Sequence, residues 1–224
     1  MIPIALSFDL IGFKASFYLT LNSPTLKVRR SEWRKLALQG HGLGNHTINH
    51  ACSASLPNRQ WVEEQNDLDK KSIEAIKEEI LLANKILKSI DDKNTRTFTV
   101  PCGDTIVEGK DLLPEITDYF VGMKTHIGAV PKNMRAFNPM NASVIVPVGL
   151  NGNTLIKQVK MAAQHNTIVS FTFHGVGSGH LTTSLTAHQS LLDYLAKNRD
   201  LYWVDTFENI SRYVKQSRFK STMK

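Results

Sequence analysis

The stretch from Gly40 to His50 reads GHGLGNHTINH and concentrates three glycines and three histidines in eleven residues. His46 and His50 stand four apart, so on a helical turn both imidazoles would lie on one face, close enough to share one metal ion. Asn45 is a good N-cap for such a helix, and the glycines give the approach the freedom of a tight strand-to-helix turn. Two histidines at this spacing are more often surface or core residues than ligands. The metal interpretation therefore depends on the rest of the chain.

Outside this stretch, apolar runs typical of buried strands alternate with amphipathic stretches typical of helices. The expected strands are residues 2–8, 14–19, 96–100, 119–123, 143–148, 168–173 and 201–204. The expected helices are residues 31–39, 69–90, 106–116, 154–164, 185–195 and 207–214. This alternation predicts an α/β fold in which helical crossovers connect parallel strands, as a barrel or a wound sheet. No internal repeat or linker interrupts the pattern, so residues 1–224 are expected to form one domain.

The composition is that of an ordinary globular protein with a formal charge of +7. The basic residues are scattered without an aromatic-basic motif, which favours a role in solubility over nucleic-acid binding. No apolar run reaches membrane-spanning length, so no transmembrane segment is expected. The two cysteines, Cys52 and Cys102, allow one disulfide and argue against a cysteine-based zinc site.

Acidic and imidazole side chains collect where the expected strands end. Asp9 follows the first strand, His46 and His50 follow the glycine-rich approach, and His174 follows residues 168–173. In parallel α/β folds, the chemistry lies at the carboxyl ends of the strands. The sequence therefore predicts a metal-assisted hydrolase site at this edge.

Five segments of the chain match motifs of one enzyme family in order and spacing. They are Ser7-Phe8-Asp9 for Thr-Phe-Asp-Asp-Gly, Lys14-Ala15-Ser16-Phe17-Tyr18 for Lys-Ala-Thr-Phe-Phe, His46-Thr47-Ile48-Asn49-His50 for His-Ser/Thr-x-x-His, Thr99-Val100-Pro101-Cys102-Gly103 for Arg-x-Pro-x-Gly, and Phe171-Thr172-Phe173-His174 for Leu-x-His. From Ile4 to about Ile210, the chain thus resembles the polysaccharide deacetylases of the NodB-homology type, carbohydrate esterase family 4. The histidine-pair motif is matched in full, the Arg-x-Pro-x-Gly motif in part, and the Leu-x-His motif loosely.

This resemblance implies a deformed (β/α) barrel that removes N- or O-acetyl groups from a carbohydrate polymer or oligosaccharide, for example of a cell wall. It implies a divalent ion, with zinc as the expected metal, held by two histidines and an aspartate. The residues at the matching positions are His46 and His50 as metal ligands, Asp9 as catalytic base, His174 as catalytic acid, and Cys102, Asp104 and His180 as oxyanion or substrate contacts. The expected location is secreted, periplasmic or cell-envelope, with a leader absent from this sequence; a cytoplasmic location is the alternative.

The chain departs from the family pattern at two functional positions, and the family's fourth motif, an Asp-rich segment with Trp, has no clear equivalent near Tyr119 to Lys124. Leu10 stands where the family has its metal-binding aspartate, and Thr99 replaces the arginine that orients the base. These losses admit a second hypothesis, a catalytically inactive carbohydrate-binding protein on the same fold. A metallopeptidase is the weaker third hypothesis, because position 47 is threonine where the His-Glu-x-x-His motif has glutamate.

The join after Asp9 is unusually short. Residues 9–13 separate two expected strands, whereas a crossover between parallel strands needs a dozen residues or more. This mismatch predicts that a stretch is missing directly after Asp9, either by a genuine deletion or because a segment that carries the metal aspartate is absent from this sequence. We also expect Cys52 and Cys102 to be neighbours, because each follows a motif that should line the opening of the site. In an exported protein they can form a disulfide.

Overall fold

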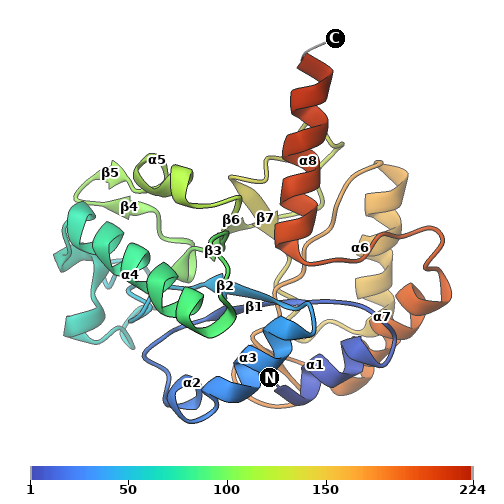
Figure 1. Ribbon diagram of the computed structural model, residues 1–224, viewed down its shortest axis with the longest axis horizontal. Coiled ribbons are helices and arrows are strands. Elements are labelled where there is room, and N and C mark those ends of the chain that lie inside the picture. The colour runs from blue at the N-terminus through green and yellow to red at the C-terminus, as the bar shows by residue number, and fades with distance from the viewer. Residues whose placement is uncertain (1, 223–224) are drawn as a thin grey trace.

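A five-stranded parallel sheet forms the centre of the computed structural model, which describes residues 2–222 (Figure 1). The ends of the expected domain, residues 1, 223 and 224, lie outside the described residues. The strands, in spatial order, are β1 (Ser16–Leu19), β2 (Gly42–Asn45), β3 (Thr97–Thr99), β6 (Gly122–Ile127) and β7 (Ala142–Val144). Beyond β7, residues 168–173 extend the array through a parallel bridge between Ile145 and Phe171. The expected deformed (β/α) barrel of parallel strands is confirmed.

Helices connect and cover these strands. They are α1 (Ile2–Asp9), α2 (Pro24–Val28), α3 (Arg30–Leu38), α4 (Ile73–Asp91), α5 (Leu113–Ile116), α6 (Gly152–Gln164), α7 (Leu185–Lys197) and α8 (Phe207–Thr222). Ser72, Asn151 and Ser184 each accept a hydrogen bond from the backbone N–H three residues ahead, which fixes the starts of α4, α6 and α7. None of the described helices is long and apolar enough to cross a membrane.

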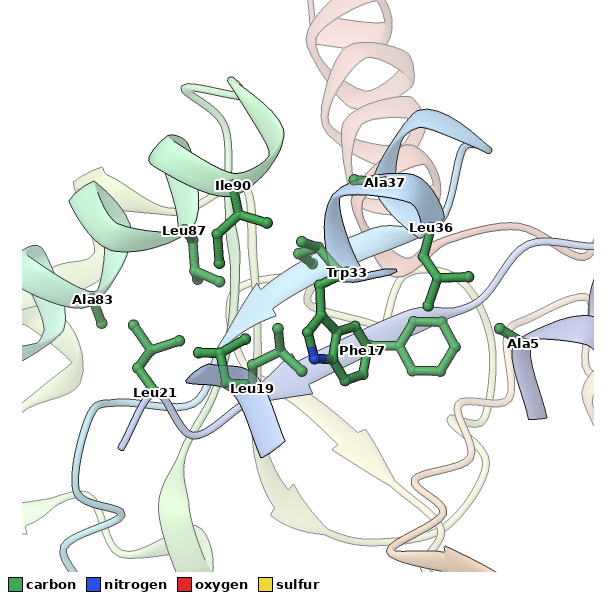
Figure 2. Close-up of a cluster of buried hydrophobic side chains, with 12 residues drawn as sticks. Ala5, Phe17, Leu19, Leu21, Trp33, Leu36, Ala37, Ala83, Leu87 and Ile90 are labelled. Carbon is green, nitrogen blue, oxygen red and sulfur yellow. The ribbon is translucent and has the colours of Figure 1, made fainter. Parts of the chain in front are cut away.

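The largest apolar cluster lies between β1 and the pair α3 and α4, as Figure 2 shows. Trp33 of α3 meets Phe17 of β1 edge to face, with ring centroids 5.7 Å apart. Leu87 and Ile90 approach from α4 and are almost fully buried. Burying a leucine or isoleucine side chain contributes roughly 1.5–3 kcal/mol. This cluster therefore holds α4 against the edge of the sheet that carries the histidine stretch.

The first segment is an α-helix, so the strand expected at residues 2–8 is wrong. Leu10 donates its N–H to the carbonyl of Leu6 at 3.0 Å, and the helical turn runs directly into the loop before β1. A strand here would need a crossover that the short loop cannot make, whereas a helix satisfies its backbone within the segment. Phe8 packs its ring on His188 of α7, with centroids 5.5 Å apart.

Three other expected elements differ in the structure. Residues 106–116 form the hairpin β4 (Ile106–Val107) and β5 (Lys110–Asp111) followed by α5, because Glu108 and Gly109 both take positive φ and reverse the chain. Residues 168–173 make a single bridge where a full strand was expected. Residues 201–204 form no strand, and Trp203 instead packs on Tyr213 of α8.

Helix α8 closes the amino-terminal end of the barrel. The N–H of Phe207 donates to Ser16 Oγ at the start of β1 at 3.0 Å. At the start of β6, Gly122 leaves room for α8, because a Cβ there would lie 2.8 Å from the Phe207 ring. The far end of α8 projects away from the rest of the molecule (Figure 1). With the amino end covered, the carboxyl ends of the strands provide the face for a site.

Candidate active site

His46 and His50 lie together just beyond the carboxyl end of β2. Their ring centroids are 4.6 Å apart and their planes are nearly perpendicular. The expected helical turn is wrong, because Thr47 and His50 both adopt positive φ, near 60°. The pair is therefore brought together by a tight loop and not by helical spacing.

Asn45 explains why this loop forms. Its side-chain amide donates to the carbonyl of Ile80 at 2.9 Å and to the side chain of Asn84 at 2.7 Å, both on α4. Its side-chain oxygen accepts from the N–H of Thr47 at 2.8 Å. These bonds anchor the buried Asn45 side chain to α4, and the chain turns through left-handed backbone conformations that cost some strain.

Glu79 of α4 clamps the same loop, and the sequence analysis missed it. Its carboxylate accepts from the N–H groups of Ile48 at 3.0 Å and Asn49 at 2.9 Å. The position of Glu79 next to the buried residues of α4 could have indicated that its carboxylate faces a neighbouring segment. The loop between the two histidines is thus fixed at both ends.

The imidazole of His46 is oriented by a backbone carbonyl. His46 Nδ1 lies 2.7 Å from the carbonyl oxygen of Thr99, so this nitrogen carries the proton and Nε2 keeps its lone pair. Burial, and secondarily the neighbouring His50, lowers the His46 pKa to about 4. Burial also lowers the pKa of His50. Both rings are therefore neutral near pH 7, which is the form that binds metal ions.

A disulfide joins the two loops that border the histidine pair. Cys52 and Cys102 are bonded, with their Cα atoms 5.9 Å apart, so the expectation that they are neighbours is confirmed. Cys102 lies in a 3-10 turn over Pro101–Gly103 at the end of β3 and has a φ of 59°. The proposed role of its N–H as an oxyanion donor stays a prediction.

The carboxylate of Asp104, next to this disulfide, is held by hydrogen bonds from neighbouring residues. It accepts two hydrogen bonds from the Arg59 guanidinium, each at 3.1 Å, and one from the N–H of Ser53 at 2.9 Å. Arg59, which the sequence analysis did not select, also lies 5.8 Å over the ring of Trp61. Trp61 leaves 59 % of its surface exposed on the loop that follows the histidine pair.

Asp9 lies at the opposite end of the sheet from the histidine pair. Its carboxylate pairs with Lys14 and approaches His41 Nε2 at 3.2 Å. His41 precedes β2 and His46 follows it, and four strand residues separate the two by about 13 Å. The expectation that Asp9 faces His46 depended on a first strand that the structure lacks. Leu10 is 87 % exposed and also lies away from the pair.

His174 and His180 complete a group of imidazoles at the open face. The charge of His174 contributes to the lowered pKa of both His46 and His50, which indicates that it lies near them. The pKa of His174 is itself lowered, first by burial and then by His180. His174 therefore lies within electrostatic reach of both His46 and His50, whereas Asp9 lies apart from them.

A divalent ion fits the histidine pair by ligand chemistry. Two neutral imidazoles, one with its tautomer fixed by a carbonyl, suit zinc or a similar metal. Among the described residues, no carboxylate joins His46 and His50 in a group of three close ligand atoms. An ion held there would have His46 and His50 as its two ligands from this loop.

Comparisons with known proteins agree on one family. Residues 8–113 match the family model for polysaccharide deacetylases. A protein from Mycobacterium smegmatis assigned as a polysaccharide deacetylase has a similar fold, with a TM-score of 0.62 and 11% identity over 97% of this chain and 77% of that chain. No curated protein sequence matches the chain significantly.

Two further similar structures differ in activity. The Bc1960 peptidoglycan N-acetylglucosamine deacetylase gives a TM-score of 0.52 and 15% identity over 92% of this chain and 78% of that chain. A CE4-family pseudoenzyme from Bacillus anthracis gives 0.51 and 14% over 94% and 60%. At these identities the likeness concerns the fold alone. The family match covers residues 8–113, just under half of the chain, so the chain resembles the polysaccharide deacetylases there and shares their fold.

Proposed function

We propose that this protein is a metal-dependent carbohydrate deacetylase that removes N- or O-acetyl groups from an acetylated polysaccharide or oligosaccharide. The observation that supports the proposal most strongly is the His46–His50 pair at the carboxyl end of β2, with the tautomer of His46 set by the carbonyl of Thr99. Two neutral imidazoles at an open face are suited to hold a divalent ion, with zinc as the expected metal. Residues 1–224 would act as one catalytic domain.

In the proposed reaction, the protein residues would position the carbonyl and the water that the metal ion would activate. A divalent ion held there would polarise the acetyl carbonyl and lower the pKa of a bound water. His46 and His50 would hold the ion. The carbonyl of Thr99 orients the His46 ring, and Glu79 fixes the loop between the two histidines. The N–H of Cys102 is the candidate donor to the oxyanion that forms as the carbonyl is attacked.

His174 is the candidate proton carrier in this chain. Its lowered pKa leaves the imidazole neutral near pH 7, so it can accept the proton of the attacking water and return it to the leaving amine or alkoxide. Asp9 cannot take the role of base from its place beside His41. A single imidazole would therefore serve both steps, and His180 and the Arg59–Asp104 pair would flank the substrate.

The surroundings of the pair suit an exported, carbohydrate-acting protein. The exposed ring of Trp61, next to Arg59 on the loop that follows the histidines, offers an apolar face of the size of a sugar ring. The Cys52–Cys102 disulfide suits an oxidising compartment such as the periplasm or the cell envelope. The similar peptidoglycan N-acetylglucosamine deacetylase supports acetylated cell-wall sugars as the first substrates to test.

Acetate release tests this proposal. Zinc-loaded protein should release acetate from acetylated chitooligosaccharides, acetylxylan or peptidoglycan fragments, and removal of the metal by a chelator should abolish the release. His46→Ala should lower the rate by roughly 100-fold or more, because one of two protein ligands is lost. His165→Ala, which removes an imidazole at the carboxyl end of α6, should leave the rate unchanged. Zinc-independent release would contradict the proposal.

A catalytically inactive carbohydrate-binding protein is the second candidate. Two observations favour it: Asp9 lies away from the pair, and the carboxylate of Asp104 is already paired with Arg59. In that case the protein should bind acetylated oligosaccharides, in a manner that Trp61→Ala weakens, and release no acetate at any metal concentration. Acetate release that follows zinc occupancy would exclude this candidate.

A further inference from the structure

We propose that reduction of the Cys52–Cys102 disulfide creates a second, sulfur-rich zinc site, in which both thiolates and Nδ1 of His50 bind the ion. The ligand atoms of His50, Cys52 and Cys102 all lie within 4.8 Å of one another, the one such group of three in the described part of the chain. In the oxidised protein the two sulfurs are bonded to each other and are not thiolates, so they do not bind zinc strongly. The site exists only after reduction.

The geometry of the oxidised protein is already close to that of a tetrahedral zinc complex. Zinc bonds of about 2.0 Å to nitrogen and 2.3 Å to sulfur place the two ligand atoms about 3.5 Å apart. His50 Nδ1 and Cys52 Sγ are 3.5 Å apart in the structure. The same bond lengths place two thiolates about 3.8 Å apart, so the sulfurs must separate by roughly 2 Å after the bond breaks. Small rotations about the Cα–Cβ bonds achieve this.

The two loops remain joined when the disulfide opens. Cys52 is fully buried, and its backbone bonds the carbonyl of Asn66 at 3.1 Å and the N–H of Leu68 at 2.9 Å. Asp104, two residues after Cys102, still accepts from the N–H of Ser53 at 2.9 Å. Arg59 holds the other side of that carboxylate. Both cysteines therefore stay at binding distance without the covalent bond between them.

His50 links the new site to the proposed catalytic pair. A neutral imidazole has one lone pair, so binding through Nδ1 moves the ring proton to Nε2 and withdraws Nε2 from an ion shared with His46. The two metal positions are therefore alternatives. This consequence rests on the proposed function, whereas the existence of the sulfur site does not.

The redox step balances with a phosphine or a dithiol as reductant. A trialkylphosphine cleaves the S–S bond, takes oxygen from one water molecule to become the phosphine oxide, and leaves two thiols. Zinc binding then replaces the two thiol protons, which are released to solvent. A dithiol reductant gives the same two thiols and leaves as its own cyclic disulfide.

Cobalt(II) is the probe, because thiolate ligands give it a charge-transfer band in the near ultraviolet. We expect no such band in the oxidised protein. After phosphine reduction and anaerobic desalting, one cobalt ion per chain should give the band, and zinc should displace it. The Cys102→Ser variant should give about half the intensity, and the Cys52→Ser, Cys102→Ser double variant should give none. His50→Ala should weaken cobalt binding to the reduced protein by about tenfold or more.

Three results would overturn the proposal. The first is a reduced protein that shows no charge-transfer band in excess cobalt. The second is an equal cobalt affinity in the wild type and in His50→Ala, which would show that the thiols bind metal without the imidazole. The third is a metal-free reduced protein that loses its near-ultraviolet circular dichroism, which would show that the loops do not stay in place. None of these readouts depends on deacetylase activity.

Discussion

Thr99 contributes to the site through its backbone and not its side chain. It stands where the resemblance places an arginine, yet its carbonyl accepts from His46 Nδ1 at 2.7 Å. Any residue at this position supplies that carbonyl, so the sequence could not reveal its role. Asn45 and Glu79 act similarly, because their side chains bond backbone groups and hold the loop in a shape that no periodicity predicts.

The lowered pKa of His46 predicts a pH dependence of stability in the metal-free protein. The native pKa of about 4 lies below the ordinary value of about 6.5, so between these values the unfolded chain binds more protons than the folded one. Stability should therefore be greatest above pH 6.5 and should fall as the pH drops towards 4. Denaturant unfolding of chelator-treated protein across this range measures the slope, and His46→Gln should flatten it. Equal slopes in the two proteins would show that His46 is not buried as a neutral ring.

Among the secondary-structure elements, helix α4 is fixed at its carboxyl end by a buried ion pair. Asp91 and Arg96 form a bidentate ion pair with N–O distances of 2.5 and 2.6 Å, and both side chains are almost completely buried. The same guanidinium donates to the carbonyl of Leu43 in β2 at 3.2 Å. The pair thus connects α4, the start of β3 and the strand that leads to the histidines.

Removing one member of this pair should destabilise the protein strongly. Asp91→Ala leaves a buried guanidinium without its partner, and we expect the free energy of unfolding to fall by about 3–5 kcal/mol. Glu208→Ala is the matched control, because it removes a partly exposed pair with Arg212 on α8 and should cost at most about 1 kcal/mol. Chemical denaturation compares the two. A similar small loss in both variants would mean that water reaches the Asp91–Arg96 pair.

The elements that the sequence predicted well carry their own signals. Isoleucines and leucines at helical spacing, with Ser72 and Ser184 as caps, mark α4 and α7. The sequence failed where neighbours decide the conformation. Residues 2–8 have the apolar pattern of a strand but fold as a helix. The connection to β1 is too short for the crossover that a parallel strand beside β1 would need. Residues 201–204 fail for a similar reason, since Trp203 packs on α8.

In the molecule as a whole, the ends of the barrel have separate roles. Helix α8 and the Asp9–His41 contact lie at the amino ends of the strands, and the histidines and the disulfide lie at the carboxyl ends. The two histidines lie close together in the structure, as the motif around them predicted, although a loop and not a helical turn brings them together. Asp9 was misplaced because its predicted position depended on the first strand.

The central claim is that His46 and His50 share one metal ion, and anomalous scattering at the zinc edge tests it most directly. Crystals of the oxidised protein grown with zinc should show one strong anomalous peak, from a zinc ion that lies about 2.0–2.1 Å from Nε2 of both residues. The Nδ1 atom of His46 should still lie within hydrogen-bond distance of the Thr99 carbonyl. A peak that contacts neither imidazole, or no peak while zinc is bound elsewhere on the chain, would contradict the account.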